Sequence, residues 1–188
     1  MDVLEWRSGT EIPSPTQAEG VAIRPLSPED LGARDVLPEG RLKPLDSFLA
    51  RGDQGYVATV RDRFAGWVWL TRVSHRDPWS GLHIRIARDE AYTYAMSVEK
   101  PDRELGVAGV LMSRLLSDVR GDSAISRVYG WVDRRNREMQ LMLRMMYGFT
   151  QVQSVWRASA PRIGLQVPWS DKPKFGPVSR FGRHSTVA

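Results

Sequence analysis

The stretch that most constrains the fold is residues 90–119, where a strand pattern, a short turn and a helix pattern follow one another. Residues 90–98 read EAYTYAMSV and alternate with a period of two, as a strand does. Residues 105–119 carry apolar side chains at a helical spacing. Small residues gather where this helix would begin, although a glycine costs about 1 kcal/mol relative to alanine in a helix interior. They are Gly106, Ala108 and Gly109.

These small residues indicate a binding site for an anion. The first turn of a helix leaves about four backbone N–H groups without intrahelical partners, and together with the helix dipole they attract negative charge. Large side chains would keep a phosphate away from these amides, whereas glycine and alanine do not. Arg103 adds a charge that suits phosphate oxygens. We therefore predict a phosphate-binding loop; close packing of the helix on a sheet is the alternative explanation of the glycines.

The strand before this loop is predicted to present one set of side chains on a single face. That set is Glu90, Tyr92, Tyr94, Met96 and Val98. The rest of the chain alternates between the two kinds of pattern. Strands are predicted at 21–26, 55–62, 64–73, 126–133, 149–157 and 162–168, and helices from 27, at 45–51 and at 136–148. This order predicts an α/β fold, a mixed sheet with helices on its faces.

Composition excludes several classes of function. The chain has no cysteine, which rules out disulfides and cysteine nucleophiles, and its three histidines are far apart, so no metal site is expected. No apolar run approaches the ~20 residues needed to span a bilayer. The opening MDVLEWRSGTEI is acidic and lacks the apolar segment of a secretory signal, so we expect a cytoplasmic protein.

The chain is expected to hold one domain with two extensions. Residues 1–19 contain the aperiodic IPSPTQAEG and are predicted to be a flexible N-terminal segment. Residues 20–168 would form the domain, and residues 169–188 a basic, poorly ordered tail. Part of the net charge of +5 lies in this last region. A basic tail can bind nucleic acid, but a solvated chain end explains it as well.

The loop motif resembles one of a known family. Arg103, Gly106 and Ala108 have the spacing Arg-x-x-Gly-x-Ala, which is similar to the acetyl-CoA loop, Gln/Arg-x-x-Gly-x-Gly/Ala, of the GCN5-related N-acetyltransferases (GNAT family). IRPLSPEDL (23–31) resembles the opening strand and first helix of that family, and EAYTYAMSV its fourth strand. The segment from Asn136 to the Gly-Phe at 148–149 resembles its closing element. The resemblance implies a GNAT-like, mostly antiparallel central sheet flanked by helices.

The resemblance also implies an activity, which is acyl transfer from coenzyme A, most simply from acetyl-CoA to a primary amine by direct attack, without a metal. The backbone N–H of Met96 would stabilise the oxyanion, typically by ~3 kcal/mol. Val98 would pair with the pantetheine arm, and Asn136 would hydrogen-bond it or cap its own helix. Arg103 and a run of backbone amides would hold the pyrophosphate. These amides belong to Glu104, Leu105, Gly106, Val107, Ala108 and Gly109.

The proton-transfer groups are the least determined part of the implied site. The attacking amine must lose a proton, and Tyr92 and Tyr94 are the candidates for the base; lining of the cleft or core is the alternative for both. A β-bulge would change which face each occupies. Many family members have a tyrosine in the closing helix that protonates the leaving thiolate. This chain has Leu143 at that position. Tyr147 is the substitute candidate for protonating the thiolate, which otherwise leaves unassisted.

Other functions remain open from the sequence. Four methionines at 139, 142, 145 and 146 fit a gap-filling core, or a flexible wall for a long acyl chain. The enzyme alternative is therefore transfer of a longer acyl chain from CoA or a carrier protein. The other alternative is a non-catalytic protein that binds CoA or nucleic acid. As partners we consider a small-molecule or peptide amine and a second copy of the chain; nucleic acid and membrane are not expected.

Overall fold

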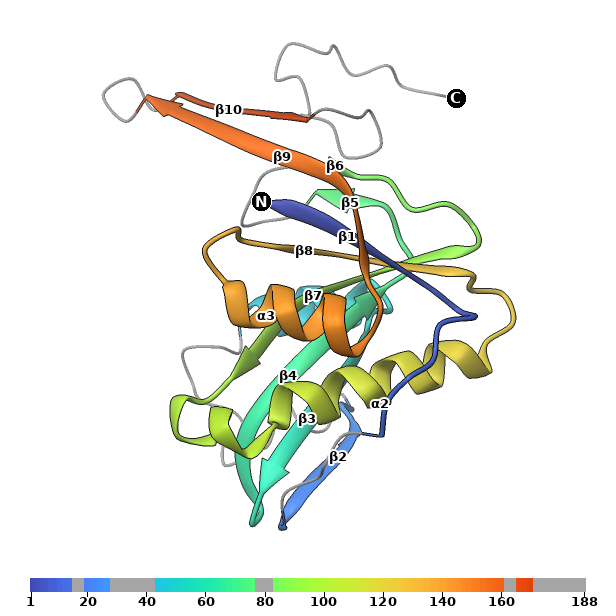
Figure 1. The fold of residues 1–188 in the computed structure, drawn as a ribbon, viewed down its shortest axis with the longest axis vertical. Helices are drawn as coiled ribbons and strands as arrows, with labels where there is room; N and C mark the ends of the chain where they lie inside the picture. Colours follow the sequence, from blue (N-terminus) through green and yellow to red (C-terminus); the bar gives the residue numbers. More distant parts are fainter. Residues whose placement is uncertain (15–18, 28–42, 77–82, 161–164, 171–188) are drawn as a thin grey trace.

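One twisted sheet organises the molecule (Figure 1). The computed structural model describes residues 1–14, 19–27, 43–76, 83–160 and 165–170. The sheet has eight strands in the order β10-β9-β1-β8-β7-β4-β3-β2. In chain order they are β1 (Asp2–Arg7), β2 (Val21–Pro25), β3 (Gln54–Val60), β4 (Arg63–Thr71), β7 (Glu90–Val98), β8 (Arg127–Val132), β9 (Thr150–Ala160) and β10 (Leu165–Ser170). Two short strands, β5 (His75–Arg76) and β6 (His83–Ile84), pair with each other.

The sheet is mixed and mostly antiparallel, as predicted. Its parallel pair is β7 with β8, and the other pairs of neighbouring strands in this sheet run antiparallel. Between these two parallel strands the chain passes through a 3₁₀ turn (Lys100–Leu105) and the helix α2 (Val107–Gly121). The helix α3 (Arg137–Leu141) follows β8 and continues as a π-helical turn (Met142–Met146). The helix start expected after residue 27 lies outside the described residues.

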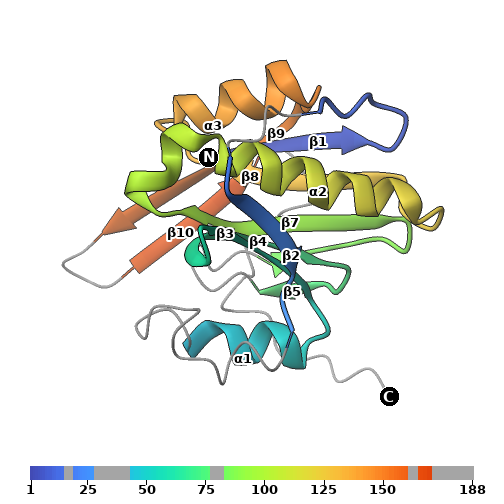
Figure 2. The same ribbon diagram turned by 90° about the horizontal axis from the view of Figure 1, so that it is seen from below.

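Helices cover both faces of the sheet. Figure 2 shows α2 and α3 on one face and α1 (Lys43–Ala50) on the other. The core under α2 contains Leu111, Leu115 and Val128, each with no exposed surface. The core under α1 gathers aromatic rings, among them Phe48 and Trp69. In the described part of the chain no helix is long and apolar enough to cross a membrane.

The first strand corrects a prediction. Residues 1–19 were expected to lie outside the fold, but Asp2–Arg7 forms β1 in the middle of the sheet, between β8 and β9. Val3 faces one core, while Leu4 and Trp6 face the other, and all three are at most 1% exposed. Their burial supplies the stabilisation that orders this segment. The domain therefore begins before residue 20, and at the other end β10 includes residues 169–170 of the predicted tail, whose remainder lies outside the described residues.

A β-bulge in β7 corrects a second prediction. Tyr94 pairs with Trp69 and Ser97 pairs with Trp67, so Ala95 and Met96 together oppose one residue of β4. Ala95 has a positive φ of 52°, which lets the extra residue fit. An extra residue moves every later side chain to the opposite face. The single face predicted for residues 90 to 98 is therefore wrong beyond Tyr94: Tyr92 and Tyr94 face the α1 side, whereas Met96 and Val98 face α2.

Candidate functional site

The cleft of the molecule lies where β7 and β8 separate. These strands pair from Glu90–Arg127 to Thr93–Gly130 and diverge beyond that point. Two cavities follow the divergence, one of about 700 Å³ beside the start of α2 and one of about 730 Å³ between β7, β8 and α3. Both are lined by Met96, Asn136 and Met139, so they are contiguous.

The first cavity contains the exposed start of α2. Gly106 precedes the helix with φ 70° and ψ 15°, a left-handed conformation that strains any residue with a Cβ. No side chain caps this end of the helix. Gly106, Ala108 and Gly109 line the cavity, and the hydrogen bonds of the helix begin with the Val110 amide, which donates to Gly106 O at 3.1 Å. The amides of Ala108 and Gly109 are therefore available to an anion.

The turn before α2 is anchored to the β3–β4 hairpin. Asp102, 1% exposed, accepts hydrogen bonds from Arg63 at 2.7 and 3.0 Å, and the Glu99 amide donates to Ala65 O at 2.8 Å. Arg103 lines the cavity, and its Nε donates to Val98 O at 3.4 Å. The hydrogen bonds to Asp102 raise the pKa of Arg63 above its ordinary value. These contacts fix the position from which α2 starts.

Most of the predicted cofactor residues are brought together here. Seven of them line the first cavity: Met96, Val98, Arg103, Gly106, Ala108, Gly109 and Asn136. Glu104, Leu105 and Val107 are not among its lining residues; Val107, the first residue of α2, is fully buried in the core. Asn136 caps α3, since its side-chain oxygen accepts from the Met139 amide at 3.1 Å, so the N-cap interpretation is confirmed.

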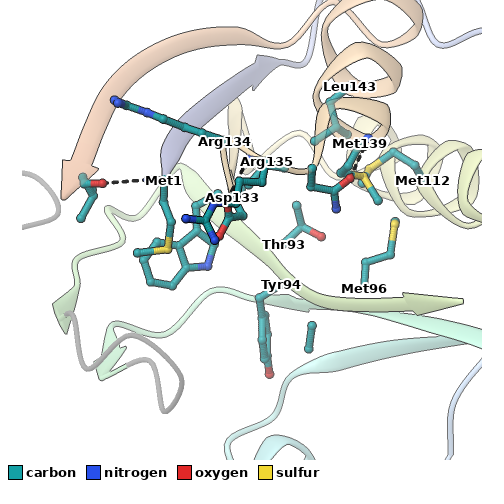
Figure 3. A pocket seen from close by; sticks show the side chains of 16 residues that line it. Met1, Thr93, Tyr94, Met96, Met112, Asp133, Arg134, Arg135, Met139 and Leu143 are labelled. Carbon is teal, nitrogen blue, oxygen red and sulfur yellow. Dashed lines mark hydrogen bonds between the residues drawn. The ribbon is translucent and has the colours of Figure 1, made fainter. Parts of the chain in front are cut away.

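Tyr94 lines the second cavity, but its hydroxyl is directed away from it. Figure 3 shows its ring extending from β7 away from Met96. The hydroxyl donates to Asp53 Oδ2 at 2.5 Å, and Arg51, which is ion-paired with Asp53, donates to the hydroxyl at 2.9 Å. Burial, followed by the hydrogen bond to Asp53, raises the pKa of Tyr94 far above its ordinary value. The phenol therefore stays protonated and bound to the carboxylate.

Tyr92 and Tyr147 are also buried in packing positions. Tyr92, 1% exposed, stacks on Tyr94 with ring centres 5.9 Å apart. Tyr147 has no exposed surface; its hydroxyl donates to Gly109 O at 2.6 Å and lies 3.0 Å from Ser113 Oγ. Burial raises the pKa of Tyr147. This contact ties the end of the π-helical turn to the first turn of α2, so the geometry favours structural roles for the tyrosines predicted as base and acid.

Several cavity residues were missed by the sequence pattern. Ser97, Glu138, Met142 and Met146 line the first cavity, and Met112, Trp131, Asp133, Arg134 and Arg135 are among those that line the second. The run of methionines from 139 to 146 is the sequence signal that could have identified some of these residues. The core interpretation is wrong for Met145 and Met146, which are 79% and 48% exposed. The π-helical turn changes the helical register there, as such turns often do at functional sites.

Comparisons with known proteins agree with this fold. No family model matches the sequence, and none of the curated proteins does. Among solved structures, a tandem GNAT protein from the clavulanic acid biosynthesis pathway has a TM-score of 0.55 at 15% identity, over 80% of this chain and 49% of that one. A Trypanosoma brucei acetyltransferase has a TM-score of 0.50 at 14% identity, over 74% of this chain and 99% of that one. A Drosophila protein has a TM-score of 0.53 at 16% identity, over 80% and 47%.

These neighbours define the class of fold. The chain has the fold of the GCN5-related N-acetyltransferases, with a mixed, mostly antiparallel sheet flanked by helices. It spans about half the length of two of the three proteins named above. At 14–16% identity the likeness shows the fold alone, and it agrees with the resemblance carried by the loop at residues 103–108.

Proposed function

We propose that this protein is an N-acyltransferase that uses an acyl-CoA as donor, acetyl-CoA being the simplest. The observation that carries the proposal is the uncapped, small-residue start of α2, which opens into a cavity continuous with the gap between β7 and β8. A diphosphate needs several converging amide donors and a nearby cation. Ala108, Gly109 and Arg103 supply both, and the small residues leave room for the phosphates.

The rest of the donor would follow the cavity from this anchor. The pantetheine arm would lie along Val98 and Ser97, which line the wall next to Arg103. The thioester would then reach Met96, where the two cavities meet. The bulge removes Ala95 and Met96 from regular pairing with β4. An amide turned out of the ladder in this way is suited to hydrogen-bond a thioester oxygen, and such a donor is worth roughly 3 kcal/mol to an oxyanion.

The reaction is direct attack on the thioester. The nitrogen of a neutral amine forms a bond with the carbonyl carbon, and the C–S bond breaks. The products are an amide and the CoA thiolate, while the nitrogen's surplus proton passes to solvent and a proton returns to sulfur. A thiol ionises with a pKa of about 8.5 in model compounds, so a thiolate leaves without a general acid. The Tyr147 hydroxyl is therefore not required as an acid in the cavity, and the amine proton passes to solvent without Tyr92 or Tyr94.

The acceptor is proposed in general terms. A small-molecule or peptide amine would enter through the second cavity, at the end where Asp133, Arg134 and Arg135 are exposed. A cytoplasmic location and a homodimer are kept as proposals that follow from the sequence. A function through the basic tail concerns residues that the structure does not describe.

Binding of CoA to the purified chain tests the proposal. Free CoA at 100 times its dissociation constant adds about 2.7 kcal/mol to the free energy of unfolding. For a domain of this size that raises Tm by roughly 5–10 °C. Gly106→Val should remove the shift while the unliganded variant stays folded by circular dichroism. Gly121→Val is the matched control, because a Cβ there meets nothing within 4 Å. Absence of any shift in the unmodified protein would refute the proposal.

A further inference from the structure

The second cavity is much larger than an acetyl group requires. An acetyl group is about the size of two water molecules, roughly 60 Å³ at about 30 Å³ per water, whereas the cavity measures about 730 Å³. Part of this space would hold the acceptor. The residues that line the cavity indicate which part, because one end is apolar and the other is charged.

One end of the cavity is apolar and closed. Figure 3 shows Met112, Met139 and Leu143 together above Met96 on the same side of the cavity. They come from α2, α3 and the π-helical turn, and Met112 and Leu143 are only 2% and 3% exposed. In the same picture Asp133, Arg134 and Met1 lie toward the opposite side. The charged end faces solvent, so it suits a polar acceptor, whereas the closed end is lined mainly by apolar side chains, with Asn136 beside Met139.

The apolar end begins at Met96, where the thioester is proposed to lie. We infer that this end is an acyl-chain pocket, and that the preferred donor carries a straight acyl chain longer than acetyl, of about four to six carbons. The inference rests on the proposed function, since it requires an acyl-CoA anchored at the start of α2. Thioether side chains on three elements give the pocket a flexible wall, which adapts to chain length more easily than branched residues do. Met96, Met112 and Met139 form this wall.

Dissociation constants for a series of donors test the inference without knowledge of the acceptor. Isothermal titration of the full chain with CoA and with acetyl-, butyryl- and hexanoyl-CoA gives the dependence on chain length. Each methylene buried in an apolar pocket is expected to tighten binding by about 4-fold. We expect at least a tenfold gain from acetyl- to hexanoyl-CoA. Equal or weaker binding of hexanoyl-CoA, with CoA still bound, would overturn the inference and leave the proposed function standing.

Matched variants locate the effect. Met112→Trp fills the closed end and should reduce the hexanoyl-to-CoA affinity ratio to about one, with little effect on CoA itself. If Met112→Trp does not fold, Met139→Trp, at a half-buried position, is judged by the same ratio. Met145→Trp is the control, because Met145 is 79% exposed and lines neither cavity. A ratio unchanged in the folded pocket variant would overturn the inference. Absence of binding by every CoA species would refute the pocket and the proposed function together.

Discussion

Gly66 sits at the closest approach between β4 and β7. It pairs with Val98, next to the bulge and the first cavity. A Cβ added at Gly66 would lie 2.6 Å from Ser97 O and 3.2 Å from Val98 Cα. Both are backbone atoms, so no side chain can rotate away to relieve the clash. Gly66→Ala therefore forces β7 to move relative to β4.

The size of this effect follows from the geometry. The contact with Ser97 O is about 0.8 Å shorter than an ordinary contact of 3.4 Å. Overpacking of this kind costs about 1–3 kcal/mol, which lowers Tm by roughly 2–12 °C in a domain of this size. Ser97 and Val98 also line the proposed path of the pantetheine arm. Because a misplacement of about 1 Å can cost 10²-fold in a positioned reaction, we expect CoA affinity to fall at least tenfold.

Two measurements check this prediction. Thermal unfolding gives the loss of stability, and titration with CoA well below the new Tm gives the loss of affinity in the folded variant. Gly121→Ala is the control; its Cβ meets nothing within 4 Å, and it should be neutral or stabilising by up to about 1 kcal/mol. A Gly66→Ala protein with the Tm and CoA affinity of the unmodified chain would show that the reasoning about this strand contact is wrong.

Three further predictions follow from buried groups. Trp6→Ala should lower the free energy of unfolding by about 3–5 kcal/mol in urea titrations, because Trp6 is fully buried in β1; an unchanged value would contradict the place of β1 in the sheet. Asp102→Asn should weaken CoA binding severalfold by releasing the turn from Arg63, whereas Asp122→Asn, in the exposed pair with Arg72, should not. Four buried tyrosines have raised pKa values, so the unfolded chain loses their protons first. The free energy of unfolding should therefore fall above pH about 10, by about 1.4 kcal/mol per pH unit for each tyrosine. Urea titrations at rising pH measure this fall, and phenolate absorbance of the native protein shows whether the tyrosines stay protonated. The four are Tyr56, Tyr94, Tyr129 and Tyr147.

Local patterns in the sequence predict much of this fold. Alternation identifies β3, β4, β7 and β8, and the apolar spacing identifies α2, because these signals need only neighbouring residues. The loop from Arg103 to Gly109 is likewise local, and four of its seven residues line one cavity: Arg103, Gly106, Ala108 and Gly109.

The parts that sequence reasoning missed depend on distant partners. The bulge in β7, with its positive φ at Ala95, arises because two residues of β7 oppose one residue of β4. Nothing in EAYTYAMSV indicates this bulge. Strict alternation therefore put Tyr94 and Met96 on one face. The strand β1 is only six residues long, and its burial comes from β8 and β9, more than 100 positions away. The Tyr94 hydroxyl donates to Asp53, which directly precedes β3 and is therefore far from Tyr94 in the sequence.

The central position of β1 has a consequence for biosynthesis. The Met1 amine donates to Val155 O across 154 positions, so β1 is completed by strands that the ribosome makes much later. At about 5–20 residues per second, the ribosome needs on the order of 10–30 s to supply them. Until β8 has been made, the apolar residues of β1 have no partner strand, and until β9 follows, β1 is an open edge of the sheet. Apolar residues and strand edges that stay exposed during synthesis make a nascent chain prone to aggregation, so we expect this interval to be the vulnerable stage of its folding.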